Sequence, residues 1–163
     1  MSRLVLNGIV ALIRQAQALA SSIGIPNILQ PGLVKEMIIA EILGHEVIYT
    51  KHDSDARDPE DPNVLFEYLS CLEGGTGQLD RVFNRPEAKR RASIQRIRRN
   101  RKVYLAIFFK KEPLKVKVIY ELDPETVAKE TEAKLDRSSN EISHVGFSEP
   151  WAKVNGKVVY STS

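Results

Sequence analysis

Residues 63–72, NVLFEYLSCL, form the most informative stretch of the sequence. The stretch is apolar and aromatic and contains a single charged residue, Glu67. Short apolar runs rich in aromatic residues are typical of buried strands. A carboxylate inside such a strand costs free energy unless it is paired or binds a cation. The stretch therefore predicts a central strand and, within it, a candidate functional residue.

The chain after this strand predicts the rest of a sheet. KVYLAIFFKK at 102–111 and LKVKVIYEL at 114–122 have the composition of strands, and a Glu-Pro dipeptide joins them as a hairpin. A basic helix is predicted over 85–100, starting near Pro86. Because this helix separates the first strand from the hairpin, we expect a mixed sheet with helices packed across it.

Helices are also predicted at 4–22, at 32–43 and from the N-cap Asp123 to about residue 137. In the second of these we expect Glu36 to face solvent. The tail is expected to be β-rich, with a tight hairpin turn at Asn155-Gly156. We therefore predict an α/β fold with one domain over 1–163, in which 1–24 is helical and 140–163 is a C-terminal β-rich region.

Composition excludes several classes of protein. The chain of 163 residues has one cysteine, Cys71, so it forms no intramolecular disulfide and no cysteine zinc cage. Its three histidines show no ligand spacing. The apolar runs are too short to span a membrane, and Asn7 and Arg14 interrupt the N-terminal run too early for a signal peptide. We expect a soluble, cytoplasmic protein without a membrane partner.

The positive charge is concentrated in one segment. Residues 85–102 contain nine basic residues and one acid, a net charge of +8, whereas the whole chain carries +3, so the remainder sums to 3 − 8 = −5. A basic stripe on an acidic protein suits a polyanion, whose neutralised phosphates release counterions. A solvated helix face is the alternative. The candidate phosphate contacts are Arg90, Arg91, Arg96, Arg98 and Arg99.

An acidic loop precedes the central strand. It contains Asp53, Asp55, Asp58, Glu60 and Asp61. Two acids from adjoining elements can hold one divalent metal through oxygen ligands, and Asp55 and Glu67 are the candidate pair. Asp58 is a weaker candidate ligand, and Asp53 and Asp61 are expected to be solvated. Alternatively, Glu67 points to solvent or pairs with an arginine.

The order of these features over about residues 14–160 resembles the type II restriction endonucleases of the PD-(D/E)xK nuclease fold. The resemblance rests on segments 30–44, 55–58, 66–70, 102–125 and 142–160. It implies a restriction-endonuclease-like domain in which Asp55 and Glu67 bind Mg²⁺. It also implies sequence-specific cleavage of double-stranded DNA by a homodimer. The broad apolar face of the helix at 4–22 is then a candidate dimer surface, with core packing as the alternative.

One member of the family pattern is missing. Family enzymes usually carry a lysine two residues after the glutamate, where this sequence has Leu69. Glu73 and Gln78 are the candidates to replace it as catalytic residues, and Lys110 is a third. The alternative is a DNA-binding protein on the same fold that does not cleave.

Two polar segments, 74–81 and 140–144, are candidates for reading DNA bases. Glutamine suits adenine, arginine suits guanine, and an aspartate can accept a hydrogen bond from the cytosine amine. For His144, a buried structural role is the alternative. The candidate base-reading side chains are Gln78, Asp80, Arg81, Ser143 and His144.

Overall fold

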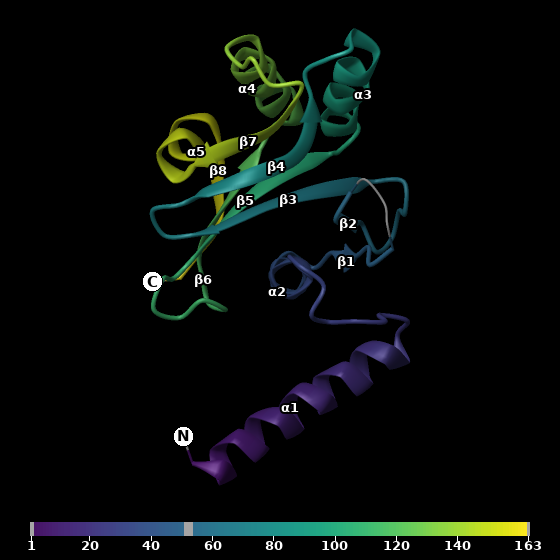
Figure 1. Ribbon diagram of the computed structural model, residues 1–163, viewed down its shortest axis with the longest axis vertical. Helices are drawn as coiled ribbons and strands as arrows, with labels where there is room; N and C mark the ends of the chain where they lie inside the picture. Colours follow the sequence, from purple (N-terminus) through teal and green to yellow (C-terminus); the bar gives the residue numbers. More distant parts are fainter. Residues whose placement is uncertain (1, 51–53, 163) are drawn as a thin grey trace. The chain divides into compact units, whose positions relative to one another are not determined.

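The computed structural model describes residues 2–50 and 54–162 and shows an α/β fold. The chain divides into two compact units, Met1–Val34 and Lys35–Ser163. The first unit contains a single long helix, and the second contains the sheets and the remaining helices (Figure 1). The single domain over 1–163 stays a prediction, and each unit is described by itself.

The first unit is built around α1 (Arg3–Ser22), which ends just before Gly24, a residue with positive φ. The side chain of Gln17 holds the following loop, because its Oε1 accepts a hydrogen bond from the Ile28 N–H at 3.0 Å. By length and composition alone α1 could cross a membrane, contrary to the sequence expectation, although one such helix near an N-terminus is weak evidence. Its large apolar side chains are mostly exposed: Leu4, Leu12 and Leu19 are examples.

Within the described part of the second unit, a six-stranded mixed sheet has the strand order β1-β2-β3-β5-β6-β8. Strands β3 and β5 are parallel, and the other neighbours are antiparallel. A separate two-stranded antiparallel ribbon is formed by β4 and β7. The strands are β1 (Glu46–Val47), β2 (Ala56–Arg57), β3 (Leu65–Leu72), β4 (Thr76–Phe83), β5 (Lys102–Phe108), β6 (Val116–Leu122), β7 (Ile142–Ser148) and β8 (Lys157–Ser161).

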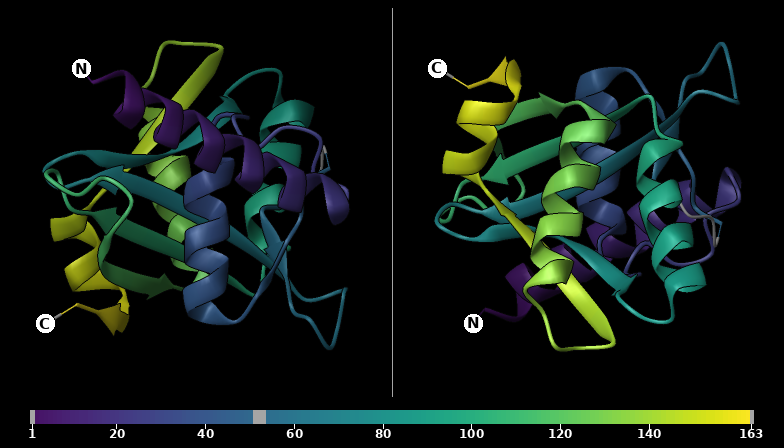
Figure 2. Two further views of the ribbon diagram at one scale, coloured as in Figure 1. Left: turned by 90° about the horizontal axis from the view of Figure 1, so that it is seen from below. Right: turned by 90° about the horizontal axis from the view of Figure 1, so that it is seen from above.

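Helices cover both faces of the sheet (Figures 1 and 2). Helix α2 packs on one face, where Ile39 and Ala40 meet the aromatic side chains of β3 and β5. The opposite face of the sheet carries the larger core, which includes Leu69, Leu105 and side chains of the β4–β7 ribbon and of the later helices. The helices after α1 are α2 (Leu33–Leu43), α3 (Glu87–Arg98), α4 (Pro124–Asp136) and α5 (Glu149–Asn155).

The strands predicted at 63–72, 102–111 and 114–122 are confirmed with shorter ends, as is the Asp123 N-cap, whose Oδ1 accepts from the Glu125 N–H. Two local predictions were wrong. Residues 73–78, EGGTGQ, have the composition of a turn or flexible loop, but Thr76, Gly77 and Gln78 already belong to β4, which is ordered because it pairs with β7. The tail contains the helix α5, capped by Ser148, so Asn155-Gly156 ends a helix and does not turn a hairpin.

The close packing of β4 on β3 depends on Gly77. A Cβ at this position would lie 2.6 Å from Leu105 Cδ1 and 2.9 Å from Leu69 Cβ. Both distances are shorter than real Cβ contacts allow, so the missing side chain lets the ribbon approach the sheet.

We expect Gly77→Ala to lower the free energy of unfolding by about 1–3 kcal/mol, because the added methyl group overpacks the core. Gly8→Ala on α1 is the matched control, since a Cβ there meets nothing within 4 Å. Urea denaturation of both variants measures the effect. Equal stability of wild type and Gly77→Ala would contradict the described contact of β4 with β3.

Candidate active site

Asp55 is held at the sheet by several hydrogen bonds. It immediately precedes β2, and its Oδ2 accepts from the Tyr68 N–H on β3 at 2.8 Å. Its own N–H donates to the Phe66 carbonyl. The preceding residue, Ser54, donates to Asn100 Oδ1 at 2.8 Å, and Asn100 in turn caps the carbonyls at the end of α3. Backbone hydrogen bonds therefore fix the position of the Asp55 carboxylate.

Glu67 is on β3 and lies beside Asp55. Glu67 Oε2 is buried and, among the described residues, has no hydrogen-bond partner. Buried polar atoms almost always have partners, so an orphaned carboxylate oxygen calls for an explanation such as a bound ion. The sequence offered two alternatives for Glu67, a side chain that faces solvent or a pair with an arginine. Neither accounts for an oxygen that is buried and, among the described residues, has no partner.

Glu36 is a third carboxylate near the pair, and the expectation that it faces solvent was wrong. It is half-buried on α2, one helical turn before the fully buried Ile39 and Ala40. Burial and the charge of Asp55 raise the pKa of Glu36 to about 7. The spacing to Ile39 and Ala40 was the available signal, because residues three and four apart share a helix face.

The carboxyl groups resist ionisation together. Burial raises the pKa of Asp55 to about 6, against the opposing effects of the Tyr68 N–H and the Arg96 charge. Burial, followed by the charge of Asp55, raises the pKa of Glu67 well above its ordinary value of 4.5, and Arg96 again opposes the shift. Buried acids of this kind become stable as anions when a cation joins them.

The residues present fit a divalent ion held by two protein ligands. Within 2–50 and 54–162 no group of three or more His, Cys, Asp or Glu side chains could hold a metal by itself. Asp55 and Glu67 nevertheless offer two adjacent carboxylates with one oxygen unsatisfied. Mg²⁺ is commonly bound through one or two carboxylates, with waters and substrate phosphates completing its shell. Asp55 and Glu67 would hold the ion.

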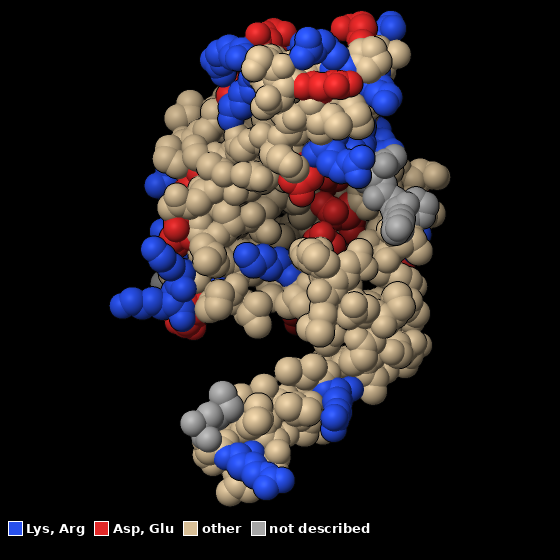
Figure 3. All heavy atoms as spheres, viewed as in Figure 1, with Lys and Arg blue, Asp and Glu red and all other residues tan. Residues whose placement is uncertain are grey.

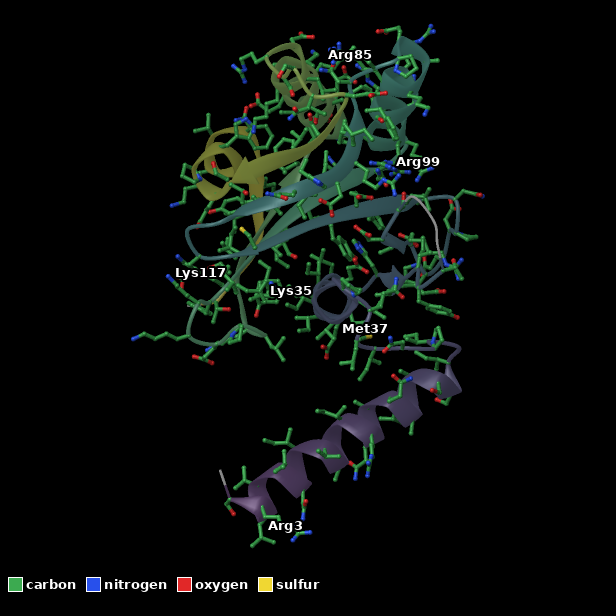
Figure 4. All side chains as sticks on the ribbon, viewed as in Figure 1. Arg3, Lys35, Met37, Arg85, Arg99 and Lys117 are labelled. Carbon is green, nitrogen blue, oxygen red and sulfur yellow. The ribbon has the colours of Figure 1, made fainter. Side chains whose placement is uncertain are left out.

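Glu73 and Gln78, the candidates to replace the family lysine, do not lie next to the Asp55–Glu67 pair. Glu73 lies past the other end of β3, where it accepts from the Lys110 N–H and pairs with Lys117 at 3.2 Å. Figure 4 shows Lys117 and Arg99 at opposite ends of the sheet. The Lys110 N–H lowers the pKa of Glu73, with the ion pair adding to the effect. Gln78 is exposed on the face of β4 opposite to Gly77.

The two candidate base-reading segments are joined as the β4–β7 ribbon. Asp80 and Arg81 form a bulge opposite His144, and Arg81 has a φ of 53°. His144 Nδ1 lies 2.9 Å from Asp80 Oδ1, and both side chains are exposed. The alternative of a buried His144 is therefore wrong. Ser143 lies on the other face of β7, where its hydroxyl contacts the Ser138 hydroxyl at 3.2 Å.

Several basic residues of α3 and its C-cap Arg99 fall into two groups. Arg90 pairs with Asp136 at 2.6 Å, and Arg98 pairs with Glu125 through two nitrogens, so both connect α3 to α4. The other group faces a cavity of about 620 Å³ along one side of α3. The basic side chains lining this cavity are Lys89, Arg96 and Arg99. Figure 3 shows acidic side chains recessed in a hollow with basic side chains beside it.

The remaining loop acids have local roles. Asp58 Oδ1 accepts from the Glu60 and Asp61 N–H groups, so it shapes the turn before β3. Asp61 is exposed and accepts from the Asn63 N–H. Asp53 lies outside the described residues.

No family model matches the sequence, and no curated protein matches it either. The resemblance to restriction endonucleases therefore remains a prediction. The features of the described residues that bear on function are the Asp55–Glu67 pair, the cavity along α3 and the β4–β7 ribbon.

In metal-free buffer, we expect Glu67→Gln to stabilise the chain increasingly as the pH rises above 4.5. Below that pH the carboxyl group is protonated in both states. Above it the unfolded group ionises while the folded group retains its proton, so wild type loses stability relative to the variant.

We expect the difference to reach about 1–3 kcal/mol near neutral pH, the cost of a poorly solvated polar group. Urea denaturation with EDTA over a pH series measures it. Glu60→Gln, at an exposed loop position, is the control and should show no such trend. A pH-independent difference would contradict the described burial of Glu67.

Proposed function

We propose that this protein is a sequence-specific double-stranded DNA endonuclease, a type II restriction enzyme that hydrolyses phosphodiester bonds with Mg²⁺. One observation carries the proposal: beside the backbone-held carboxylate of Asp55, a buried oxygen of Glu67 has no hydrogen-bond partner in the part of the chain that the structure describes. An orphaned acid is expensive in a protein that has no cation to bind. Its neighbourhood of basic side chains favours a polyanionic substrate.

When bound by Asp55 and Glu67, Mg²⁺ would stabilise the charge that develops on the scissile phosphate. The chain itself supplies position and electrostatics. The Tyr68 N–H orients Asp55, so the carboxylate is in place before substrate arrives. Burial on β3 restricts water around Glu67, which strengthens the interaction of its charge with a cation.

In this proposal the cavity along α3 takes the phosphates of the DNA backbone. Lys89, Arg96 and Arg99 line it at helical spacing, so one side of the helix presents three positive charges. Arg91 is exposed on the same helix but does not line this cavity. Arg90 and Arg98 contribute less to binding in this proposal, because acidic partners on α4 already engage them. Such contacts add affinity without reading sequence.

The β4–β7 ribbon suits the reading of bases, since the DNA major groove admits a two-stranded β-ribbon. Its outer face presents Gln78, Asp80 and His144, and the bulge redirects Arg81. We do not assign Ser143 to base contact, because it lies on the inner face.

We further propose a cytoplasmic homodimer, since a palindromic target requires two-fold symmetry. The exposed apolar side chains of α1 offer a surface for the second copy. The same helix would satisfy a membrane by length and composition, so the oligomeric state in detergent-free solution separates the two roles.

A DNA-binding protein that does not cleave is the second candidate. Leu69 favours it, because this residue is 2% exposed and carries no polar group where family enzymes usually have lysine. The two candidates share the α3 cavity and the ribbon and differ only in chemistry at the carboxylate pair.

Digestion of long unmethylated DNAs with purified protein and Mg²⁺ tests the proposal. We expect discrete fragments that disappear with EDTA, in Asp55→Asn and in Glu67→Gln, whereas DNA binding by the variants stays within a few-fold of wild type. Loss of a metal ligand should reduce cleavage by at least about 100-fold. Intact DNA with tight binding would select the second candidate, and fragments from Glu67→Gln would contradict the site assignment.

If the ribbon reads bases, Asp80→Ala and His144→Ala should relax specificity at one position of the site that the digest defines. We expect discrimination there to fall by about 1–3 kcal/mol, the value of a good base contact. Cleavage of the single-base variants of that site measures the change. Lys157→Ala on β8, exposed at the far edge of the sheet, is the control. Unchanged discrimination in both ribbon variants would reject base reading by this pair.

A further inference from the structure

Position 69 cannot supply a cation in this fold. Leu69 alternates onto the same face of β3 as Glu67, and it is almost fully buried. The ribbon closes over it at Gly77, where there is no room even for a Cβ beside Leu69. A lysine ammonium there would be desolvated and would favour its neutral form. Any positive charge next to the carboxylate pair must therefore come from another element.

Arg96 is placed to supply that charge from α3. Its Nη2 donates to the Asp80 carbonyl at 3.0 Å, so the guanidinium is held between α3 and the ribbon that covers β3. The side chain is half-exposed and lines the cavity along α3. Whereas Arg90 and Arg98 are paired with acids of α4, no carboxylate of the described residues is in an ion pair with Arg96.

Hydrogen bonds also tie this turn of α3 to the carboxylate pair. Asn100 Nδ2 donates to the Arg96 carbonyl at 3.0 Å, and Asn100 Oδ1 accepts from the hydroxyl of Ser54, the residue before Asp55. An arginine suits this place better than a lysine would, because guanidinium stays charged when partly buried and its planar fork matches phosphate oxygens.

We propose that Arg96 contacts the scissile phosphate, supplying from α3 the positive charge that position 69 cannot provide. The inference rests on the proposed function and names a residue that would touch the substrate. In hydrolysis, the water oxygen bonds to phosphorus and the bond from phosphorus to the 3′-oxygen breaks. The water loses a proton to solvent, and the 3′-oxygen takes one up. Arg96 keeps its protons throughout and donates hydrogen bonds to the non-bridging oxygens.

Cleavage by Arg96→Ala, Arg96→Lys and the control Arg137→Ala tests the role. At saturating DNA we expect Arg96→Ala to cut about 100-fold or more slowly, the scale for losing one donor to a developing anion. Arg96→Lys should recover part of the rate, and added guanidinium ion should partly restore Arg96→Ala. Arg137 is exposed on the C-cap of α4 and should cut like wild type.

A second readout does not depend on cleavage. In metal-free buffer with a fluorescein-labelled duplex, loss of one phosphate contact should flatten the slope of log binding constant against log salt by about 0.9. Arg137→Ala should leave the slope unchanged. Circular dichroism and thermal unfolding establish that Arg96→Ala is folded, and Arg96→Lys, which retains the charge, should keep the wild-type slope.

The outcomes separate the inference from the proposed function. Wild-type cleavage by Arg96→Ala, or an unchanged salt slope, would overturn the role of Arg96 and leave the endonuclease proposal standing. A wild type that binds but never cuts would overturn the endonuclease proposal, while the salt slope still decides the phosphate contact. A wild type that binds no DNA would overturn both.

Discussion

The hydrogen bond from the Tyr68 N–H to Asp55 Oδ2 determines how the candidate site is built. β2 is only two residues long and antiparallel to β3, and it begins too late in the chain to pair with β3 beyond Phe66. The carboxylate of Asp55 takes up a backbone donor that a longer strand would have satisfied. This hydrogen bond places Asp55 against β3 beside Glu67. Sheet hydrogen bonding therefore brings the two acids together, although their charges repel each other.

The parallel pairing of β3 with β5 brings the basic helix to the same place. A crossover between parallel strands must return along one face of the sheet, and α3 forms that return. Its last turn is fixed to the loop before Asp55 through Asn100, which bonds Ser54 on one side and helix carbonyls on the other. The same connection that orders the strands therefore sets the cations of α3 near the acids.

The sequence predicted the parts whose signal is local. The strand around Glu67, the hairpin strands and the Asp123 cap follow from periodicity, β-propensity and capping chemistry. β4 was missed because its glycines and polar residues resemble a loop, and only pairing with β7, more than sixty positions along the chain, makes it a strand. Glu36 was misplaced because its burial comes from tertiary packing of α2. The contact of Asp80 with His144 likewise depends on that distant strand pairing.

The apolar residue at position 69 follows from the layering of the fold. The β4–β7 ribbon packs so closely on β3 that Gly77 leaves no space above Leu69, and an apolar side chain is the residue that such a buried position accepts. Close packing of the ribbon places Asp80 and His144 over the sheet. The same packing buries position 69, so a lysine there could not carry a charge beside the carboxylates. In our proposal the positive charge at the carboxylates comes instead from α3, through Arg96, which is anchored on the ribbon by its hydrogen bond to the Asp80 carbonyl.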